Sequence, residues 1–232
     1  MSMKKIRIAL FALVLALSGC AAPQGEPAEE PAEETQSAEP EETPAAEPEE
    51  TEAAAEDGKK ELLVYFSRAG ENWEVGVVEK GNTRIAAEYI AEKTGADVFE
   101  IIPSVPYPED YMETVDLAME EKNAGARPEI ESVPENWEDY DTVILGYPIW
   151  HGDLPMIVYT FLESYDFTGK TVYPFNTHGG SGLAGTPDKI RSVIPEADVK
   201  DGLALTGKTV QNDFGSVQSE IDQWLDDNGL IR

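Results

Sequence analysis

The sequence predicts an α/β domain built on a doubly wound, five-stranded parallel sheet. Between residues 61 and 232, five short apolar runs alternate with stretches of helical periodicity, which is the pattern of successive βαβ units. Loops rich in Gly, Pro and small polar residues follow the first, third and fourth apolar runs. The carboxyl ends of parallel strands meet at one edge of a sheet, so we expect these loops to converge on a ligand site there.

The expected strands are the apolar runs, and the expected helices have apolar residues at helical spacing. The strands lie at residues 62–66, 97–102, 142–147, 171–176 and 198–205, and the helices at 83–93, 109–122, 155–164, 187–193 and 214–227. Gly95 and Asn228-Gly229 are typical helix ends, and Pro155 suits a first helical position. Such alternation favours helices on both faces of the sheet.

Residues 1–20 predict an export signal that is not part of the fold. A basic start precedes an apolar run at residues 8–17, which is far shorter than the ~20 residues needed to span a bilayer. Leu17-Ser18-Gly19-Cys20 resembles a bacterial lipobox, whose cysteine becomes lipidated. This implies a lipoprotein anchored to a bacterial membrane on the extracytoplasmic side, although a plain secreted protein is an alternative.

Residues 21–60 predict a disordered acidic tether, and 61–232 a single folded domain. Up to residue 58 the tether consists almost entirely of Ala, Pro, Glu and Thr and contains no aromatic residue and no Ile, Leu, Val or Met, so it has too little to bury against the entropy of ordering. Cys20 is the single cysteine of the chain. The domain therefore has no thiol for disulfides, nucleophilic catalysis or metal ligation.

The chain is strongly acidic, with 46 Asp and Glu residues and a formal net charge of −29. Such a surface repels nucleic acid and anionic lipid head groups. It suits a protein partner with a basic patch, and ordinary solubility is the alternative explanation.

The first loop has the features of an anion site. Ser67-Arg68-Ala69-Gly70 follows the first strand, and Gly81-Asn82-Thr83 stands where the next helix begins. Hydroxyls, an amide and the unpaired N–H groups of a helix start can bind a phosphate together, helped by the helix dipole. Arg68 either pairs with the phosphate or faces solvent. The alternative for the whole loop is a structural strand–helix turn.

An insertion, Glu71–Lys80, interrupts this loop. It contains Trp73 and three valines, and we interpret it as a small hairpin or flap. Trp73 either covers a bound ligand or packs against neighbouring residues.

The other two loops add an aromatic and a titratable side chain. Pro148-Ile149-Trp150-His151-Gly152 follows the third strand, and Thr177-His178-Gly179-Gly180-Ser181-Gly182 follows the fourth. His178 is a candidate proton donor or a polar surface residue. A serine-hydrolase elbow is excluded because Leu183 stands where its last Gly should be. No metal site is expected, since the two histidines lack carboxylates at ligand spacing.

These loops, together with Pro106-Tyr107-Pro108 and Gly146-Tyr147-Pro148, resemble a bacterial flavodoxin-like family with an inserted phosphate loop. The resemblance covers residues 61–232 and implies strand order 2-1-3-4-5 and non-covalent FMN. It places the FMN phosphate at the first loop, with Trp150 stacked on the flavin and Gly152 donating to or accepting from flavin N5. Residues 177–182 would then bind the N1/O2 edge. Typical flavodoxins have an aromatic residue in this last loop, whereas this chain has none, so one flavin face is less covered.

Three functions are compatible with the sequence. The first is a membrane-anchored FMN electron carrier that moves one or two electrons between redox partners. The second is an FMN-dependent oxidoreductase of the NAD(P)H/quinone type, motivated by the less covered flavin face, although NAD(P)H is scarce outside the cytoplasm. The third is a non-redox binding module on the same fold.

Overall fold

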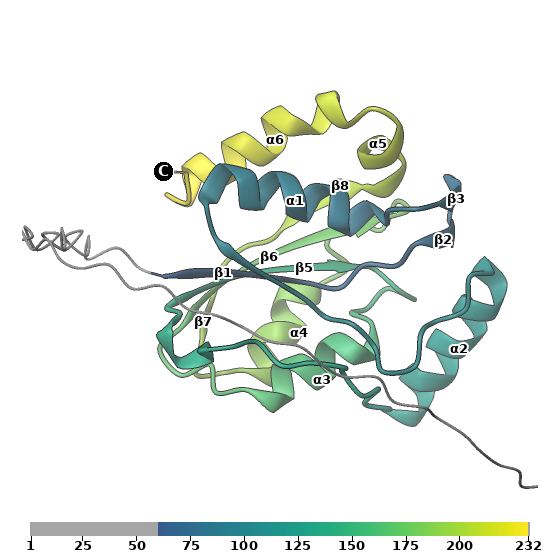
Figure 1. The fold of residues 1–232 in the computed structure, drawn as a ribbon, viewed down its shortest axis with the longest axis horizontal. Helices are drawn as coiled ribbons and strands as arrows, with labels where there is room; N and C mark the ends of the chain where they lie inside the picture. Colours follow the sequence, from purple (N-terminus) through teal and green to yellow (C-terminus); the bar gives the residue numbers. More distant parts are fainter. Residues whose placement is uncertain (1–59, 232) are drawn as a thin grey trace, which may run out of the picture. The chain divides into compact units, whose positions relative to one another are not determined.

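The computed structural model describes residues 60–231 (Figure 1). The predicted signal peptide, Cys20 and the tether up to residue 59 lie outside the described residues. Within residues 60–231, no helix is both long enough and apolar enough to cross a membrane.

The centre of the domain is a parallel sheet. Its strands are β1 (Glu61–Tyr65), β4 (Asp97–Glu100), β5 (Thr142–Pro148), β6 (Thr171–His178), β7 (Asp198–Val199) and β8 (Leu203–Thr206). The order is β4-β1-β5-β6-β7, with β8 also paired to β6, and every pair is parallel. The predicted fold and the order 2-1-3-4-5 are confirmed, with β7 and β8 together forming the fifth strand.

The fifth strand lies in the range predicted for it, 198–205, but it is interrupted between β7 and β8. Thr171 pairs with Asp198, but Phe175 pairs with Leu203, which means that the register slips by one residue between them. Pro174 lies at this break and has no N–H for a ladder hydrogen bond. Gly202 passes close to it, because a Cβ built on Gly202 would lie 3.2 Å from the Pro174 carbonyl oxygen. We interpret the slip as a β-bulge that accommodates the proline.

The five predicted helices are all present. They are α1 (Asn82–Thr94), α2 (Tyr111–Ala124), α3 (Met156–Ser164), α4 (Thr186–Val193) and α6 (Phe214–Asp227). Two short elements were not predicted, a 3₁₀ turn at Trp137–Asp139 and α5 (Gly207–Asn212), because so few residues give no clear periodicity. Pro155 is the N-cap of α3, with ψ at 144°, and is not its first helical residue as predicted. Asp110 caps α2 by accepting from the N–H of Glu113.

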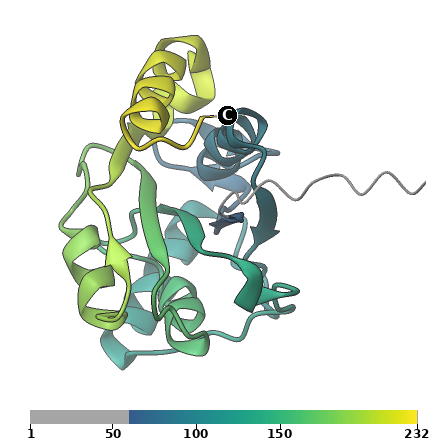
Figure 2. The same ribbon diagram turned by 90° about the vertical axis from the view of Figure 1, so that its left-hand side faces the viewer.

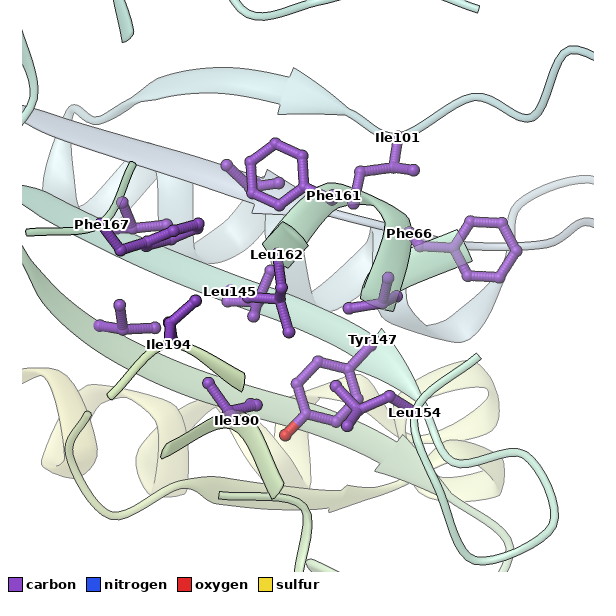
Figure 3. Packing of buried hydrophobic residues seen from close by; sticks show 14 of the residues in the cluster. Phe66, Ile101, Leu145, Tyr147, Leu154, Phe161, Leu162, Phe167, Ile190 and Ile194 are labelled. Atoms are coloured by element: carbon purple, nitrogen blue, oxygen red, sulfur yellow. The ribbon is translucent and has the colours of Figure 1, made fainter. Parts of the chain in front are cut away.

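Helices cover both faces of the sheet. Helices α1, α5 and α6 lie on one face, and α3 and α4 on the other (Figures 1 and 2). Each face has its own apolar cluster. Figure 3 shows the apolar cluster between the sheet and helices α3 and α4, where Tyr147 and Phe161 lie among buried aliphatic side chains. Burying each such side chain contributes about 1.5–3 kcal/mol, which keeps the strand ends in fixed positions.

The insertion forms the expected hairpin. Strands β2 (Gly70–Asn72) and β3 (Gly76–Val78) pair antiparallel and lie beside α2, at the end of the sheet where β1 ends (Figure 1). The N–H of Glu71 donates to the Glu109 carbonyl at 2.8 Å, which ties the hairpin to the start of α2.

Candidate functional site

A pocket of about 340 Å³ lies at the carboxyl ends of the strands. All three predicted loops contribute to it, together with the hairpin, α2 and the start of α5. The predicted residues that line it are Ser67, Arg68, Asn82, Thr83, Pro148, Ile149, Trp150, His151, Gly152, Thr177, His178, Gly179 and Ser181. Because β1 has β4 on one side and β5 on the other, the pocket opens at the topological switch point of the sheet, where α/β proteins bind ligands.

Four predicted residues do not line the pocket: Ala69, Gly70, Gly180 and Gly182. Gly70 instead begins β2 with φ at +85°, and a Cβ there would lie 2.9 Å from the Glu109 carbonyl oxygen. Its role is therefore to let the hairpin approach α2 closely.

One end of the pocket is the start of α1. Gly81 is the N-cap, and the Ser67 hydroxyl oxygen accepts from the N–H of Arg84 at 3.1 Å. A Cβ on Gly81 would lie only 2.3 Å from that oxygen and 2.4 Å from the Arg68 carbonyl oxygen, so only glycine fits. The N–H groups of Asn82 and Thr83 have no acceptor within residues 60–231. This end of the pocket therefore presents donors and the positive end of a helix dipole to an anion.

Two side chains of α1 line this end of the pocket, and one of them is bonded to the third loop. The hydroxyls of Thr83 and Thr177 are hydrogen-bonded at 2.8 Å and buried. The side-chain oxygen of Asn82 is buried without a hydrogen-bond partner in the protein, although Asn82 lines the pocket. A buried acceptor of this kind is costly unless a ligand or water donates to it.

The Arg68 guanidinium is held by the protein backbone. It donates to the carbonyls of Pro108 at 2.7 Å, Glu109 at 3.2 Å and Glu71, and so joins the hairpin to the start of α2 while the residue stays partly exposed. Burial lowers the pKa of Arg68, against the opposing effect of Glu71 and Asp110. The donors at the start of α1 are consequently neutral groups.

Trp150 also lines the pocket and is fixed by aromatic contacts. It meets Phe66 edge to face at 5.4 Å and Tyr107 at 4.9 Å between ring centroids. The Tyr107 hydroxyl in turn donates to Glu121 at 2.9 Å. The N–H of Ile149 donates to the Thr177 carbonyl at 2.9 Å, which holds the second and third loops together. Trp150 thus offers an aromatic surface whose position is set before any ligand binds.

Trp73 reaches from the hairpin to the third loop. Its ring lies 5.7 Å from that of Tyr111, and a Cβ on Gly179 would come within 2.6 Å of the Trp73 indole. Although 55% exposed, Trp73 lines the pocket. Of the two roles considered for it from the sequence, packing against neighbouring residues is confirmed, and covering a bound ligand stays a prediction. Trp73 places an aromatic ring beside the loop that has none of its own.

The comparisons with known proteins identify the family. A flavodoxin family profile matches residues 60–227. The chain belongs to the flavodoxin family. No curated protein matches it significantly.

Solved flavodoxin-like structures resemble it over nearly their whole length. A protein from Bacteroides eggerthii that is assigned as a flavoprotein is 33% identical, with a TM-score of 0.59, over 73% of this chain and 97% of its own. A similarly assigned protein from Bacteroides uniformis is 29% identical (TM-score 0.56), over 73% and 99%. A flavoprotein from Lactobacillus acidophilus, solved in complex with FMN, is 23% identical (TM-score 0.54), over 72% and 99%. The last similarity supports the fold alone.

The two histidines of this flavodoxin occupy different environments. His178 Nδ1 accepts from the N–H of Gly180 at 2.9 Å, which places the proton of the neutral ring on Nε2. Burial lowers the pKa of His178, and Glu220 partly offsets this. Near neutral pH His178 is therefore a neutral N–H donor. His151 Nε2 donates to the Val115 carbonyl at 2.8 Å and is committed to α2.

Sequence reasoning missed the contribution of α2 and α5 to this flavodoxin pocket. The unpredicted lining residues are Asn72, Trp73, Tyr111, Thr114, Val115, Ala118 and Gly207; of these, Trp73 was considered only as a possible cover. The acidic start of α2 looks like an ordinary solvent-facing helix in the sequence, and the loop before it gives no sign of its direction. Gly207 follows a bulge that the sequence did not reveal.

No metal centre was found in the described part of the chain. Residues 60–231 contain no group of three or more His, Cys, Asp or Glu side chains placed to hold a metal ion.

Proposed function

We propose that this flavodoxin binds FMN non-covalently and serves as an electron carrier tethered to a bacterial membrane. The observation that carries the proposal is the combination of an anion site and a fixed aromatic surface in the lining of one pocket. FMN has a phosphate at one end and a three-ring flavin at the other, and it accepts one or two electrons when bound.

The residues of the pocket fit this cofactor. The N–H groups of Asn82 and Thr83 and the hydroxyl of Ser67 suit a phosphate, since the hydroxyl can still donate its hydrogen while accepting from Arg84. The unpartnered side-chain oxygen of Asn82 suits a hydroxyl of the ribityl chain. Membership of the flavodoxin family supports the same assignment, and a protein of the same fold from Lactobacillus acidophilus was solved in complex with FMN.

The two indoles would hold the flavin and limit its contact with water. Trp150 is held by aromatic contacts with Phe66 and Tyr107. Trp73 is positioned by its contact with Gly179. This arrangement favours the electron carrier over the oxidoreductase, because Trp73 occupies space beside the loop where a substrate ring was expected to stack. An oxidoreductase remains the second candidate function, and a non-redox module the third.

Membrane attachment and the redox partner are proposed from the sequence. Lipidation of Cys20 would anchor the chain on the extracytoplasmic side, and the acidic segment between Cys20 and the domain would let the domain reach partners. The net charge of −29 favours a redox protein with a basic patch, attracted over distances comparable to the Debye length.

Absorbance during stepwise chemical reduction tests the cofactor and its redox activity. We expect the purified protein to bind one FMN and to show a flavin spectrum that bleaches reversibly under dithionite. A protein that binds no FMN, or binds it without reversible reduction, would favour the non-redox module.

Electron transfer to defined acceptors tests the carrier against the enzyme. We expect the reduced protein to reduce a basic c-type cytochrome in a stopped-flow experiment, at a rate that falls as salt rises. Steady-state quinone reduction with NADH or NADPH, at a rate above that of free FMN, would instead support the oxidoreductase.

The lipid anchor is tested separately. In a bacterial host, the full chain should partition into detergent and incorporate labelled fatty acid, whereas Cys20→Ser should do neither. Equal partitioning of both proteins would contradict lipidation at Cys20.

A further inference from the structure

The turn at residues 150–153 lines the pocket in an uncommon backbone conformation. The N–H of Trp150 donates to the Asp153 carbonyl at 2.9 Å, and the N–H of Asp153 to the Trp150 carbonyl at 3.0 Å. Between them, φ is +50° at His151 and +68° at Gly152, the pattern of a type I′ turn. Positive φ at a non-glycine residue is costly and persists only where the surroundings enforce it. The positive φ of His151 therefore implies that neighbouring groups hold the turn in this conformation.

Two lysines hold the carbonyl groups of this turn. Lys122 of α2 donates to the His151 carbonyl at 2.8 Å, and Lys189 of α4 donates to the Gly152 carbonyl at 2.9 Å. Both ammonium groups also contact the Asp153 carboxylate, at 3.4 and 2.9 Å respectively. One carboxylate thus positions two cations, each bound to a different carbonyl of the same turn.

The Asp153 carboxylate is itself well fixed. It accepts from the N–H of Leu154 and from the Tyr159 hydroxyl, both at 2.9 Å, and Asp153 is only 9% exposed. Charge-assisted hydrogen bonds in such surroundings are stronger than those between neutral groups. The lysines are therefore held at the turn by a rigid anchor, unlike solvent-exposed ion pairs, which contribute little.

The lysines determine which backbone groups the turn can offer to a ligand. His151 and Gly152 line the pocket, whereas Lys122 and Lys189 do not. The N–H and C=O of a trans peptide point in opposite directions, so the Gly152 N–H points away from Lys122. This N–H has no acceptor among residues 60–231. The turn can give the pocket an N–H donor, while both carbonyls are occupied elsewhere.

We propose that Lys122, Lys189 and Asp153 are positioning residues that lock this turn, so that it offers a bound flavin a donor and withholds its carbonyls. The proposal rests on FMN binding as proposed above. Uptake of two electrons from a redox partner and one proton from water changes N5 of a flavin from a hydrogen-bond acceptor to a donor. A turn that can only donate stabilises the oxidised flavin and lowers its midpoint potential. The lysines thus oppose any rotation of the peptide between His151 and Gly152 that would present a carbonyl to the reduced flavin.

The midpoint potential of the bound flavin distinguishes the effect of the locked turn from the effect of the lysine charges, because the two shift it in opposite directions. Removing a positive charge near a flavin disfavours the electron-rich reduced form and lowers the potential. Freeing the turn acts in the opposite direction, because a released carbonyl can accept from N5–H. For the double variant Lys122→Met/Lys189→Met we expect the reduced-to-oxidised affinity ratio for FMN to rise about tenfold, equivalent to about +30 mV for a two-electron couple.

A matched control measures the charge effect alone. Lys208 follows the pocket-lining Gly207 and has an exposed side chain, and it does not touch the turn. Lys208→Met should leave the potential unchanged or lower it. The conservative Lys189→Arg should keep a donor at the Gly152 carbonyl and stay close to wild type. A double variant whose potential falls, as expected for lost charge, would overturn the proposal.

Hydrogen exchange in the protein without FMN tests the lock independently of the cofactor. Loss of the lysines should speed exchange of the Asp153 amide about tenfold, corresponding to the loss of roughly one hydrogen bond, while amides in β5 stay protected. Unchanged exchange at Asp153 would also overturn the lock. Failure of the wild-type protein to bind FMN would instead refute the proposed function, whatever the exchange result. If the double variant does not fold, each single variant is measured in the same two assays.

Discussion

Replacement of Gly81 by alanine tests the anion site at the start of α1. The added Cβ would lie 2.3 Å from the Ser67 hydroxyl oxygen and 2.4 Å from the Arg68 carbonyl oxygen, where real contacts are at least 3.0 Å. The second of these is a backbone atom, so the loop or the helix must move by about 0.6 Å or more in a close-packed region.

This movement has two costs. Overpacking contributes about 1–3 kcal/mol, and loss of the hydrogen bond from the Arg84 N–H to Ser67 adds about 1 kcal/mol. We therefore expect Gly81→Ala to lower the free energy of unfolding by about 2–4 kcal/mol. Displaced N–H donors should weaken FMN binding about 10- to 100-fold, since catalytic and binding groups lose this much for shifts of about 1 Å.

Fluorescence titration with FMN and with riboflavin measures this effect, alongside urea unfolding. Riboflavin lacks the phosphate, so its affinity should change little in Gly81→Ala. The control is Gly215→Ala in the first turn of α6, where no atom lies within 4 Å of the added Cβ; it should stabilise the helix by less than about 1 kcal/mol and leave FMN affinity unchanged. Equal loss of FMN and riboflavin affinity in Gly81→Ala would refute a phosphate site at this helix.

Three further changes test other parts of the site and fold. Trp73→Ala should weaken FMN binding by about 1 kcal/mol and increase quenching of the bound flavin by iodide, while Trp73→Phe should preserve both. Lys170→Met should lower the free energy of unfolding by about 2 kcal/mol, because the buried ammonium donates to the carbonyls of Trp137 and Tyr140; FMN affinity should not change. His178→Gln should abolish part of the stability loss between pH 7 and 5. In the wild type the folded-state pKa of His178 lies below its ordinary value of 6.5, so the unfolded chain binds the proton first as pH falls, and the folded state loses its advantage.

Each of these expectations has a result that contradicts it. Unchanged iodide quenching in Trp73→Ala would show that Trp73 does not cover the flavin. Unfolding of Lys170→Met at the wild-type urea concentration would show that the two carbonyls find other donors. An identical pH profile for His178→Gln would assign the acid sensitivity to the carboxylates.

The sheet could be predicted from the sequence because its strands are continuous apolar runs between turn residues. Val64 and Leu145 are fully buried within two of these runs, and burial on both faces produces that pattern. The break between β7 and β8 could not be predicted, because it depends on which residue of the neighbouring strand faces Pro174. Pairing register is a property of two segments together, and the fifth run alone contains no sign of it.

The three loops of the pocket could also be predicted, since each follows a strand. The roles of single residues were harder to predict. For Arg68 the sequence offered pairing with the phosphate or exposure to solvent, and it gave no sign of the hydrogen bonds that its guanidinium makes to backbone carbonyls of the loop before α2. That contact depends on how the Pro-rich loop folds back over a separation of some forty residues, which local sequence patterns do not encode.

The aromatic residue beside the third loop also depends on a contact between distant segments that local sequence patterns do not encode. The third loop has no aromatic residue of its own, and the sequence therefore predicted a less covered flavin face. The structure brings Trp73 to Gly179 from an insertion more than a hundred positions earlier in the chain. Only glycine at 179 leaves room for the indole, so the two residues form one feature that neither segment reveals alone.

Titration of the purified, cofactor-free protein with FMN tests the central claim most directly. Calorimetry together with tryptophan fluorescence should show one FMN per chain, a dissociation constant below about 1 µM, equivalent to about −8 kcal/mol, and quenching of indole emission as the flavin enters between Trp73 and Trp150. No binding at FMN concentrations up to about 100 µM, or binding that leaves indole emission unchanged, would contradict the account.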